Sequence, residues 1–238
     1  MIADVIADAV TIAGKELKEI LSRGGTARGR RGMIGTVVRP ALVGLLFGLN
    51  IGRGRSGAAL AVLPVAFFAM ATASALVADT IAGERERHTL ETLLVSPASD
   101  ESILAGKLGA VVLYAWAVAL IQLLAVAVTG IALSPAHRVS AGLIAVVALF
   151  ALLEATLSAA LGVQFSVRAA TVRAAARSQA QVGIVLSLLA GGANFAVADP
   201  RLGGPVVAGA AFVVLVAADA VLLGLARARF RRGRLLVA

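Results

Sequence analysis

Three ionisable side chains, Arg39, Glu154 and Asp219, stand inside long apolar runs of the sequence, and they are the first candidates for chemistry. A charge in hydrocarbon is costly, so such groups usually pair with one another or face water, and they often mark a path for an ion or a substrate. Two roles are therefore open. Arg39 could pair with one of the two carboxylates and serve assembly, or the three groups could form the polar lining of a translocation path.

Two further patterns resemble catalytic motifs and carry less weight. Residues 54–57 spell G-x-S-G, the nucleophile motif of rhomboid-type intramembrane proteases, but a serine nucleophile needs a histidine base, and His88 and His137 lie in other connections. The sequence has no cysteine, no HExxH zinc motif and no phosphate-binding G-x-x-x-x-G-K-[ST] loop. We therefore expect no metal site, no bound cofactor and no catalytic residue in this chain.

The composition indicates a membrane protein with several spans. Hydrophobic residues make up 60% of the chain, charged residues 15%, and the mean hydropathy is +0.95. These values lie far from those of a soluble domain. The net charge of +9 would suit a nucleic-acid binder, but aromatic residues make up only 4%, and the basic residues lie between apolar runs rather than on one soluble face. We expect a lipid membrane as the surroundings, and no nucleic acid.

A helical span needs about 20 apolar residues to cross about 30 Å of hydrocarbon. Six runs qualify, at residues 34–51, 57–80, 108–133, 141–163, 180–198 and 205–226. Six spans place both termini on one side, and 17 of the 22 Lys and Arg residues then fall on that side. By the positive-inside rule both termini are cytoplasmic. The predicted fold is an all-α polytopic protein of the plasma membrane, with a fifth span interrupted near Gly191, Gly192 and Asn194.

The N-terminal segment is expected to lie on the membrane rather than cross it. In residues 2–21 the apolar positions recur every three or four residues, which predicts an amphipathic helix too polar to span. Packing of this helix on a soluble partner is the alternative. The chain would then divide into an interfacial helix with a basic connector, residues 1–33, and a six-span domain, residues 34–238.

The first predicted span carries three glycines at steps of four, Gly44, Gly48 and Gly52. Such a stripe of small residues lets another helix approach closely. The partner helix could belong to the same chain or to a second copy, and the sequence alone leaves both open.

Ile81 to Lys107 is the one long charged segment between two strongly apolar runs. Leucines would share one side of a helix here, and charged residues would cover the remainder. We predict a cytoplasmic amphipathic helix at residues 81–97 that touches both the membrane and a soluble partner. A solvated loop that only sets topology is the alternative, but topology alone needs no leucine face.

This segment resembles the signature of the ATP-binding-cassette (ABC) type-2 permeases, E-R-E-x-G-T-L-E-x-L-L-x-x-P after the second span, followed by Gly106-Lys107. His88 stands where that family usually has glycine, and residues 15–19 look like the family's interfacial elbow helix. The resemblance implies that residues 81–95 form a coupling helix that docks into a separate cytoplasmic ATPase subunit, which holds ATP and Mg. The implied coupling residues are Glu84, Arg85, Glu86, His88, Leu90, Glu91 and Leu94.

The expected function is therefore that of a non-catalytic permease subunit, paired with a second copy, that exports a substrate when its ATPase hydrolyses ATP. A proton-coupled secondary transporter that uses Glu154 and Asp219 is one alternative. A membrane anchor or assembly factor for an ATPase is another. Nothing in the spans selects the substrate.

Overall fold

The computed structural model describes residues 2–23, 27–52, 58–86, 98–133, 140–169, 171–199, 201 and 204–230. Apart from short turns, these residues are helical, so the all-α prediction is confirmed for the part of the chain that is described. The elements are α1 (Ile2–Arg23), α2 (Ala27–Gly52), α3 (Ala58–Val77), the π-helical turn η1 (Ala78–Ala82), α4 (Gly83–Glu86), α6 (Asp100–Leu133), α7 (Ala141–Ser166), α8 (Val172–Ala198) and α9 (Gly204–Arg229).

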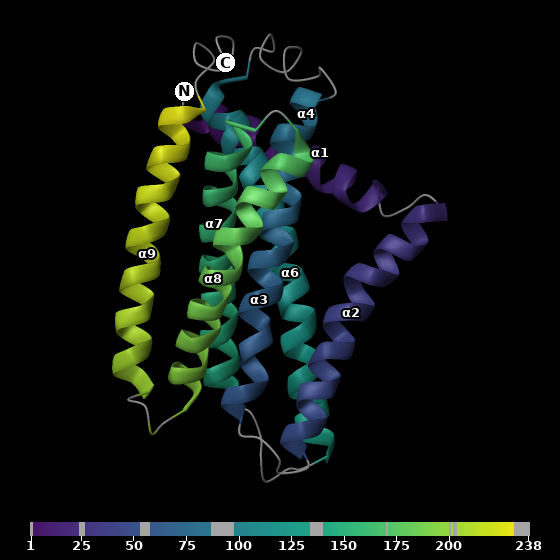
Figure 1. Cartoon of the computed structure of the whole chain (residues 1–238), viewed down its shortest axis with the longest axis vertical. Coiled ribbons are helices and arrows are strands. Elements are labelled where there is room, and N and C mark those ends of the chain that lie inside the picture. The colour runs from purple at the N-terminus through teal and green to yellow at the C-terminus, as the bar shows by residue number, and fades with distance from the viewer. Residues whose placement is uncertain are drawn as a thin grey trace.

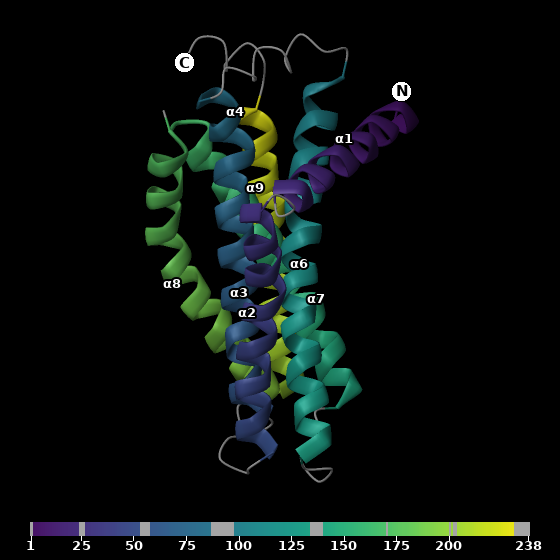
Figure 2. The same cartoon turned by 90° about the vertical axis from the view of Figure 1, so that its right-hand side faces the viewer.

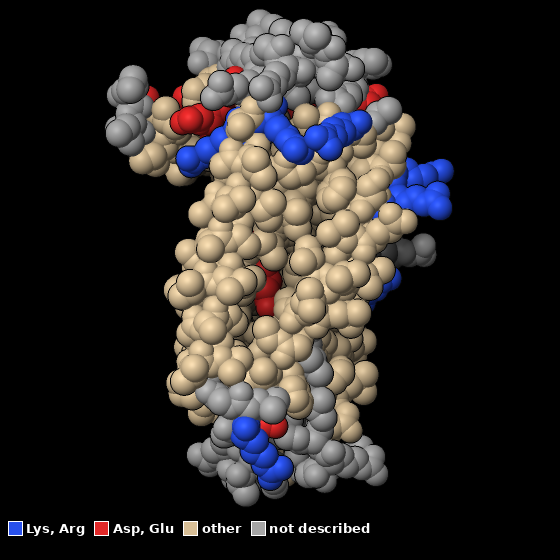
Figure 3. Space-filling view, turned by 60° about the vertical axis from the view of Figure 1, so that its left-hand side comes forward, with Lys and Arg blue, Asp and Glu red and all other residues tan. Residues whose placement is uncertain are grey.

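Five stretches of helix within the described residues are long and apolar enough to cross a membrane. They are Pro64–Ala82, Asp100–Leu133, Ala141–Ser166, Val172–Ala198 and Pro205–Arg229. Within the described part of helix α2, Val37–Asn50 is a shorter apolar stretch. Most of the face shown in Figure 3 between the two ends of the molecule carries no charged side chain, apart from a small acidic patch near its centre and basic groups along one edge.

The long helices run side by side along the molecule, and α1 projects from the bundle near one end (Figures 1 and 2). The start of α1, the end of α9 and the short helix α4 all lie towards that end. Helix α3 packs against α6, α7 and α8, whereas α2 lies mainly on α6 and α9 mainly on α7. The helices α2 and α9 therefore occupy opposite sides of the bundle (Figure 1).

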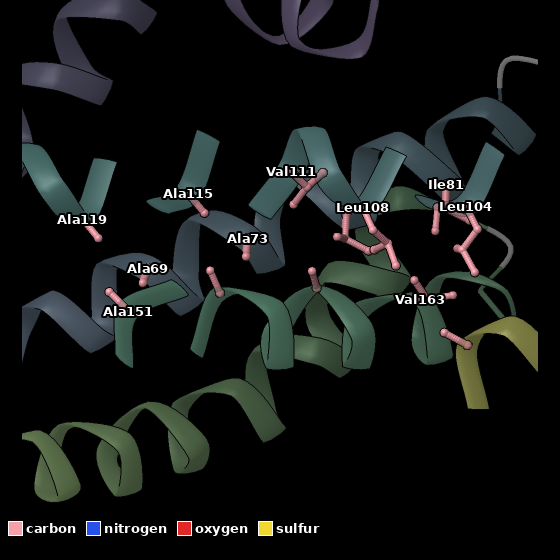
Figure 4. Packing of buried hydrophobic residues seen from close by; sticks show 14 of the residues in the cluster. Ala69, Ala73, Ile81, Leu104, Leu108, Val111, Ala115, Ala119, Ala151 and Val163 are labelled. Atoms are coloured by element: carbon pink, nitrogen blue, oxygen red, sulfur yellow. The ribbon is translucent and has the colours of Figure 1, made fainter. Parts of the chain in front are cut away.

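The shared core of α3, α6 and α7 changes in character along its length (Figure 4). Its middle is built from fully buried alanines, such as Ala73 and Ala115, which allow close packing of the helices. Larger side chains, including Ile81, Leu104 and Leu108, fill the end of the core next to α4. At that end, large apolar side chains pack α3, η1 and α6 together.

Two glycines of the predicted stripe pack α2 against α6 of the same chain. A Cβ atom on Gly44 would lie 2.4 Å from the backbone oxygen of Gln122, and one on Gly48 would lie 2.7 Å from the Cβ of Thr129. Gly52 is the last residue of α2. Of the two partners left open by the sequence, the structure brings a helix of the same chain to Gly44 and Gly48.

Gly44→Ala is expected to destabilise the protein by about 1–3 kcal/mol, because backbone atoms cannot move aside for the new methyl group. Thermal unfolding in detergent would measure the effect. Gly109→Ala in α6 is the control, since a Cβ there meets nothing within 4 Å. Equal melting temperatures for the two variants would contradict the close α2–α6 contact.

Candidate coupling site

Lys107 lies at the meeting point of three elements at the α4 end of the bundle. Its side chain is only 2% exposed, and its ammonium group donates to Glu16 Oε1 at 2.5 Å, Glu84 Oε1 at 2.6 Å and the backbone oxygen of Thr80 at 3.5 Å. A lysine ammonium has three N–H donors, so each donor has an acceptor here. We call Glu16, Thr80, Glu84 and Lys107 the Lys107 junction. It joins α1, η1 and α4 to α6.

The start of α6 places Lys107 at this point. Ser99 caps the helix by accepting a hydrogen bond from the backbone N–H of Ser102 at 3.1 Å. Two turns into α6, a Cβ on Gly106 would lie 2.7 Å from the Cβ of Ile12 and 2.8 Å from the backbone oxygen of Ala9. The missing side chain lets α1 rest on the α6 backbone. Glu16, one helical turn beyond Ile12, then reaches Lys107.

The end of α3 supplies the second and third acceptors. The chain passes from α3 into the π-helical turn η1, in which the Thr80 hydroxyl donates to the backbone oxygens of Leu76 at 3.0 Å and Val77 at 3.2 Å. Single π-helical turns are rare and occur often at functional sites. The turn leads directly into α4, so the Thr80 carbonyl and the Glu84 carboxylate face Lys107 together.

The other carboxylate of α4 is directed to a different helix. Glu86 Oε2 accepts a hydrogen bond from the backbone N–H of Val172, the first residue of α8, at 3.3 Å. The preceding Thr171 caps α8 by accepting from the backbone N–H of Ala174 at 3.2 Å. An anion near a helix N-terminus is stabilised by the helix dipole. Glu84 and Glu86, two positions apart, thus connect α4 to α6 and to α8 respectively.

The three ionisable residues of the apolar runs are not brought together. Glu154 is fully buried, and its Oε1 accepts from the side-chain amide of Asn194 in α8 at 2.8 Å. Asp219 is buried in α9, and neither of its oxygens has a hydrogen-bond partner among the described residues. Arg39 is exposed on α2. The predicted pairing of Arg39 with a carboxylate is not formed, because α2 packs on α6 while α9 packs on α7.

A line of buried polar contacts holds α8 to its neighbours. The Gln179 amide donates to the backbone oxygen of Ser158 at 3.0 Å, and the Ser158 hydroxyl donates to the backbone oxygen of Met70 at 2.8 Å. With the Glu154–Asn194 hydrogen bond, these contacts fix α8 against α7 and α7 against α3. The predicted interruption of the fifth span is wrong: α8 continues to Ala198, with Asn194 bound to Glu154 rather than part of a turn.

Residues 50–206 match the family model described as ABC-2 family transporter protein. The chain belongs to the ABC-2 transporter family. Among curated proteins, no match to this permease was found. The matched region holds Glu84, Glu86 and Lys107, while Glu16 precedes it. In the described residues of the permease, no group of three or more His, Asp or Glu side chains is close enough to hold a metal ion.

The structure places only part of the predicted coupling segment of the permease. Glu84 turns inward to Lys107, Glu86 is exposed and reaches the start of α8, and Arg85 lies between them in α4. Glu84 is thus bound within the chain, and its role in docking stays a prediction. The remaining predicted coupling residues lie outside the described residues, and their role stays a prediction: His88, Leu90, Glu91 and Leu94.

Sequence reasoning missed the Lys107 junction of the permease. Lys107 ends the charged segment between two apolar runs, and Glu16 falls in the amphipathic N-terminal segment, so neither local pattern predicts their contact. One signal was available, because a glycine directly before Lys107 allows another helix to approach closely beside it. The identity of its two partners depends on contacts between distant parts of the chain.

A groove of about 300 Å³ opens between α3 and α8 of the permease. Its walls are apolar apart from two hydroxyl groups, and they include Phe67, Met70, Ser74, Gly183, Ile184 and Ser187. The Ser187 hydroxyl lies 3.7 Å from the Met70 sulfur at the buried side of the groove. The polar contacts that hold α8 therefore also fix one wall of this groove.

Asn194→Leu should destabilise the permease by about 1–3 kcal/mol, because the buried Glu154 carboxylate loses its described hydrogen-bond donor. Thermal unfolding in detergent would measure the loss. Gln181→Leu is the matched control, since Gln181 lies on the same helix with an exposed side chain. Wild-type stability of Asn194→Leu would mean that the Asn194 amide does not help to hold α8 in place.

Proposed function

We propose that this chain is the permease subunit of an exporter powered by a separate cytoplasmic cassette ATPase. The observation that carries the proposal is the position of α4, which follows a membrane-capable helix directly. Glu84 binds Lys107 of α6, which also binds Glu16 of α1, and Glu86 binds the start of α8. A displacement of this end of the bundle would reach several spans at once. ATP binding can move the spans only if the ATPase contacts differ between the inward and outward states.

The proposed topology has six spans, with Val37–Asn50 as the membrane-embedded part of the first, and both termini in the cytoplasm. Exposed arginines near the start of α8 and the end of α9, including Arg173, Arg177 and Arg227, support a cytoplasmic assignment for the α4 end. Residues 1–33 form the interfacial region and 34–238 the permease domain, with the coupling helix at 81–97. The plasma membrane is the proposed location, and ATP and Mg belong to the partner ATPase.

We propose further that two copies form the working permease, as the family resemblance implies. Helices α8 and α9 leave most of their surface uncovered within one copy, which leaves apolar area for lipid and for a second subunit. Native mass spectrometry of the detergent-solubilised complex would measure the number of permease subunits. A single copy per complex would rule out the homodimer.

The central experiment is co-expression of the tagged permease with a candidate cassette ATPase from the same genome. The ATPase should be retained on the purified permease, and Glu91→Lys should weaken its binding by about tenfold or more, as expected for loss of a charge at a docking surface. Arg201→Glu, a charge reversal at the opposite end of the bundle, should leave binding unchanged. If the wild-type permease never retains the ATPase, and Glu91→Lys leaves ATP-dependent transport intact, the proposal is wrong.

A proton-coupled secondary transporter is the second candidate. It is favoured by the buried carboxylate oxygens of Glu154 and Asp219 that have no hydrogen-bond partner among the described residues. This candidate requires uptake or release by proteoliposomes under a proton gradient in the absence of ATP. A membrane anchor that recruits an ATPase but forms no translocation path would instead bind the ATPase, and no substrate would stimulate its ATP hydrolysis.

A further inference from the structure

We propose that Lys107 is a positioning residue through which movement of α4 is passed to the interfacial helix α1, and from α1 to the first span, α2. The inference deepens the proposed function and rests on it. It assigns Glu16 a role in transmission rather than in docking, and it extends the coupling machinery beyond the segment between the second and third spans. Four observations lead to it.

The first observation is the place of the ammonium group between two elements far apart in sequence. Glu16 and Lys107 are separated by 91 positions, and Glu84 and Lys107 by 23. The same side chain, at 2% exposure, holds a carboxylate of α1 and a carboxylate of α4. A charge-assisted hydrogen bond that is shielded from water is short and directional, so α1 and α4 are held at fixed positions relative to one point on α6.

The second observation is that two carboxylates share one ammonium group. One carboxylate is enough to neutralise Lys107, and Glu84 of α4 already does this. A second carboxylate with only 13% side-chain exposure adds a desolvation cost and a repulsion between like charges. Neutralisation of the Lys107 charge therefore does not explain why Glu16 also binds Lys107. A mechanical connection between α1 and α4 does explain it.

The third observation is that the two carboxylates of α4 bind two different helices. Helices α1 and α2 lie mainly on α6, whereas α8 lies mainly on α3 and α7, and α6 itself also packs against α3 and α7. Glu84 connects α4 to α6, and Glu86 connects it to α8. A displaced α4 would thus act on α6 and on α8 through two separate carboxylates.

The fourth observation is the contact beside the Lys107 junction. Helix α1 rests on α6 at Gly106 through the side chain of Ile12 and the backbone oxygen of Ala9. This contact keeps α1 close to α6 without any charge, so the Glu16–Lys107 interaction is not needed to keep α1 on the bundle. Removal of the Glu16 charge should therefore leave the fold intact and abolish only the transmission of movement from α4 to α1.

The test uses the complex of the permease with its cassette ATPase, reconstituted in membranes and diluted with unlabelled permease. The sequence has no cysteine, so spin labels can be attached at introduced cysteines alone. One pair, Lys18→Cys in α1 and Leu149→Cys in α7, reports the movement of α1. The other, Ile184→Cys in α8 and Leu113→Cys in α6, reports the movement of α8. All four positions are exposed.

In the wild-type complex both distances should change between the nucleotide-free state and the state trapped with ATP and vanadate. In Glu16→Gln the change reported from α1 should fall about fivefold or more, the lower range of a coupling between sites. The change reported from α8 should persist, and the affinity for the ATPase should stay within about twofold of wild type. Asp8→Asn, the same carboxylate-to-amide change at an exposed position of α1, should behave as wild type.

An unchanged α1 movement in Glu16→Gln would overturn the inference, since the Lys107 junction would then carry no motion. Loss of both movements, or of ATPase binding, would also overturn it, because Glu16 would then support the whole fold. A wild-type permease that binds no ATPase would instead refute the proposed function. The failures of the two proposals can therefore be told apart by the binding measurement on the wild-type protein.

Discussion

Lys107→Met is expected to lower the stability of the permease by about 3–5 kcal/mol, the usual cost of removing one partner of a buried ion pair. Methionine fills nearly the same space, so the loss does not come from a cavity. It comes from the Glu16 and Glu84 carboxylates, which would face each other at low exposure with no cation between them. Thermal unfolding in detergent and the yield of folded protein would measure the effect.

Two further variants separate the charge effect from other causes. Lys15→Met, at an exposed position of α1, should change stability by no more than about 0.5 kcal/mol. The triple variant Lys107→Met, Glu16→Gln, Glu84→Gln removes all three charges and should regain more than half of the loss. A Lys107→Met protein as stable as wild type, or a triple variant as unstable as Lys107→Met, would contradict the buried charge network.

The sequence predicts the positions of the helices well where local pattern decides them. The amphipathic period of residues 2–21 corresponds to α1, and the apolar runs correspond to the long helices. The predicted third span begins at residue 108, whereas α6 begins at Asp100. The difference has a physical cause. The sequence pattern makes Lys107 a boundary charge, whereas in the structure Lys107 is buried within the helix and neutralised by Glu16 and Glu84.

Contacts between distant segments account for the parts that the sequence does not predict. A glycine pair and an asparagine suggest a broken fifth span, but Asn194 has a partner 40 positions away, Glu154, and the helix continues. From the sequence alone, either Glu154 or Asp219 could be the partner of Arg39. The small residues of α2 bring this helix to α6, and Arg39 is exposed on α2.

The same limitation applies to the coupling segment. The pattern of residues 81–97 predicts a charged helix and a soluble partner, and it does not predict which groups Glu84 and Glu86 bind. The structure distinguishes them, since Glu84 faces the buried Lys107 and Glu86 faces the N-terminus of α8. This difference arises from the π-helical turn η1 and from the placement of α8. Neither can be predicted from the spacing of apolar residues in this segment.

A substitution at Gly106, where α1 contacts α6, is the second change expected to cause a large loss of stability. Gly106→Leu should cost about 3 kcal/mol or more, at the upper end for overpacking, because even a Cβ atom there would lie 2.7 Å from Ile12 and 2.8 Å from the backbone of Ala9. Helix α1 would have to move away from α6, and Glu16 would be withdrawn from Lys107. Limited proteolysis of α1 and thermal unfolding would measure the detachment.

Gly109→Leu is the matched control for this substitution, one turn further along α6 at a position where a Cβ meets nothing within 4 Å. It should leave both the stability and the protection of α1 close to wild type.

The effects of Gly106→Leu and Glu16→Gln on the movement of α1 should be non-additive, because groups that act through one contact do not contribute independently. Once Gly106→Leu has separated α1 from α6, adding Glu16→Gln should cause no further loss of the nucleotide-dependent α1 movement. A further loss in the double variant would mean that Glu16 and Gly106 act on α1 separately, and that Glu16 does not act through α6.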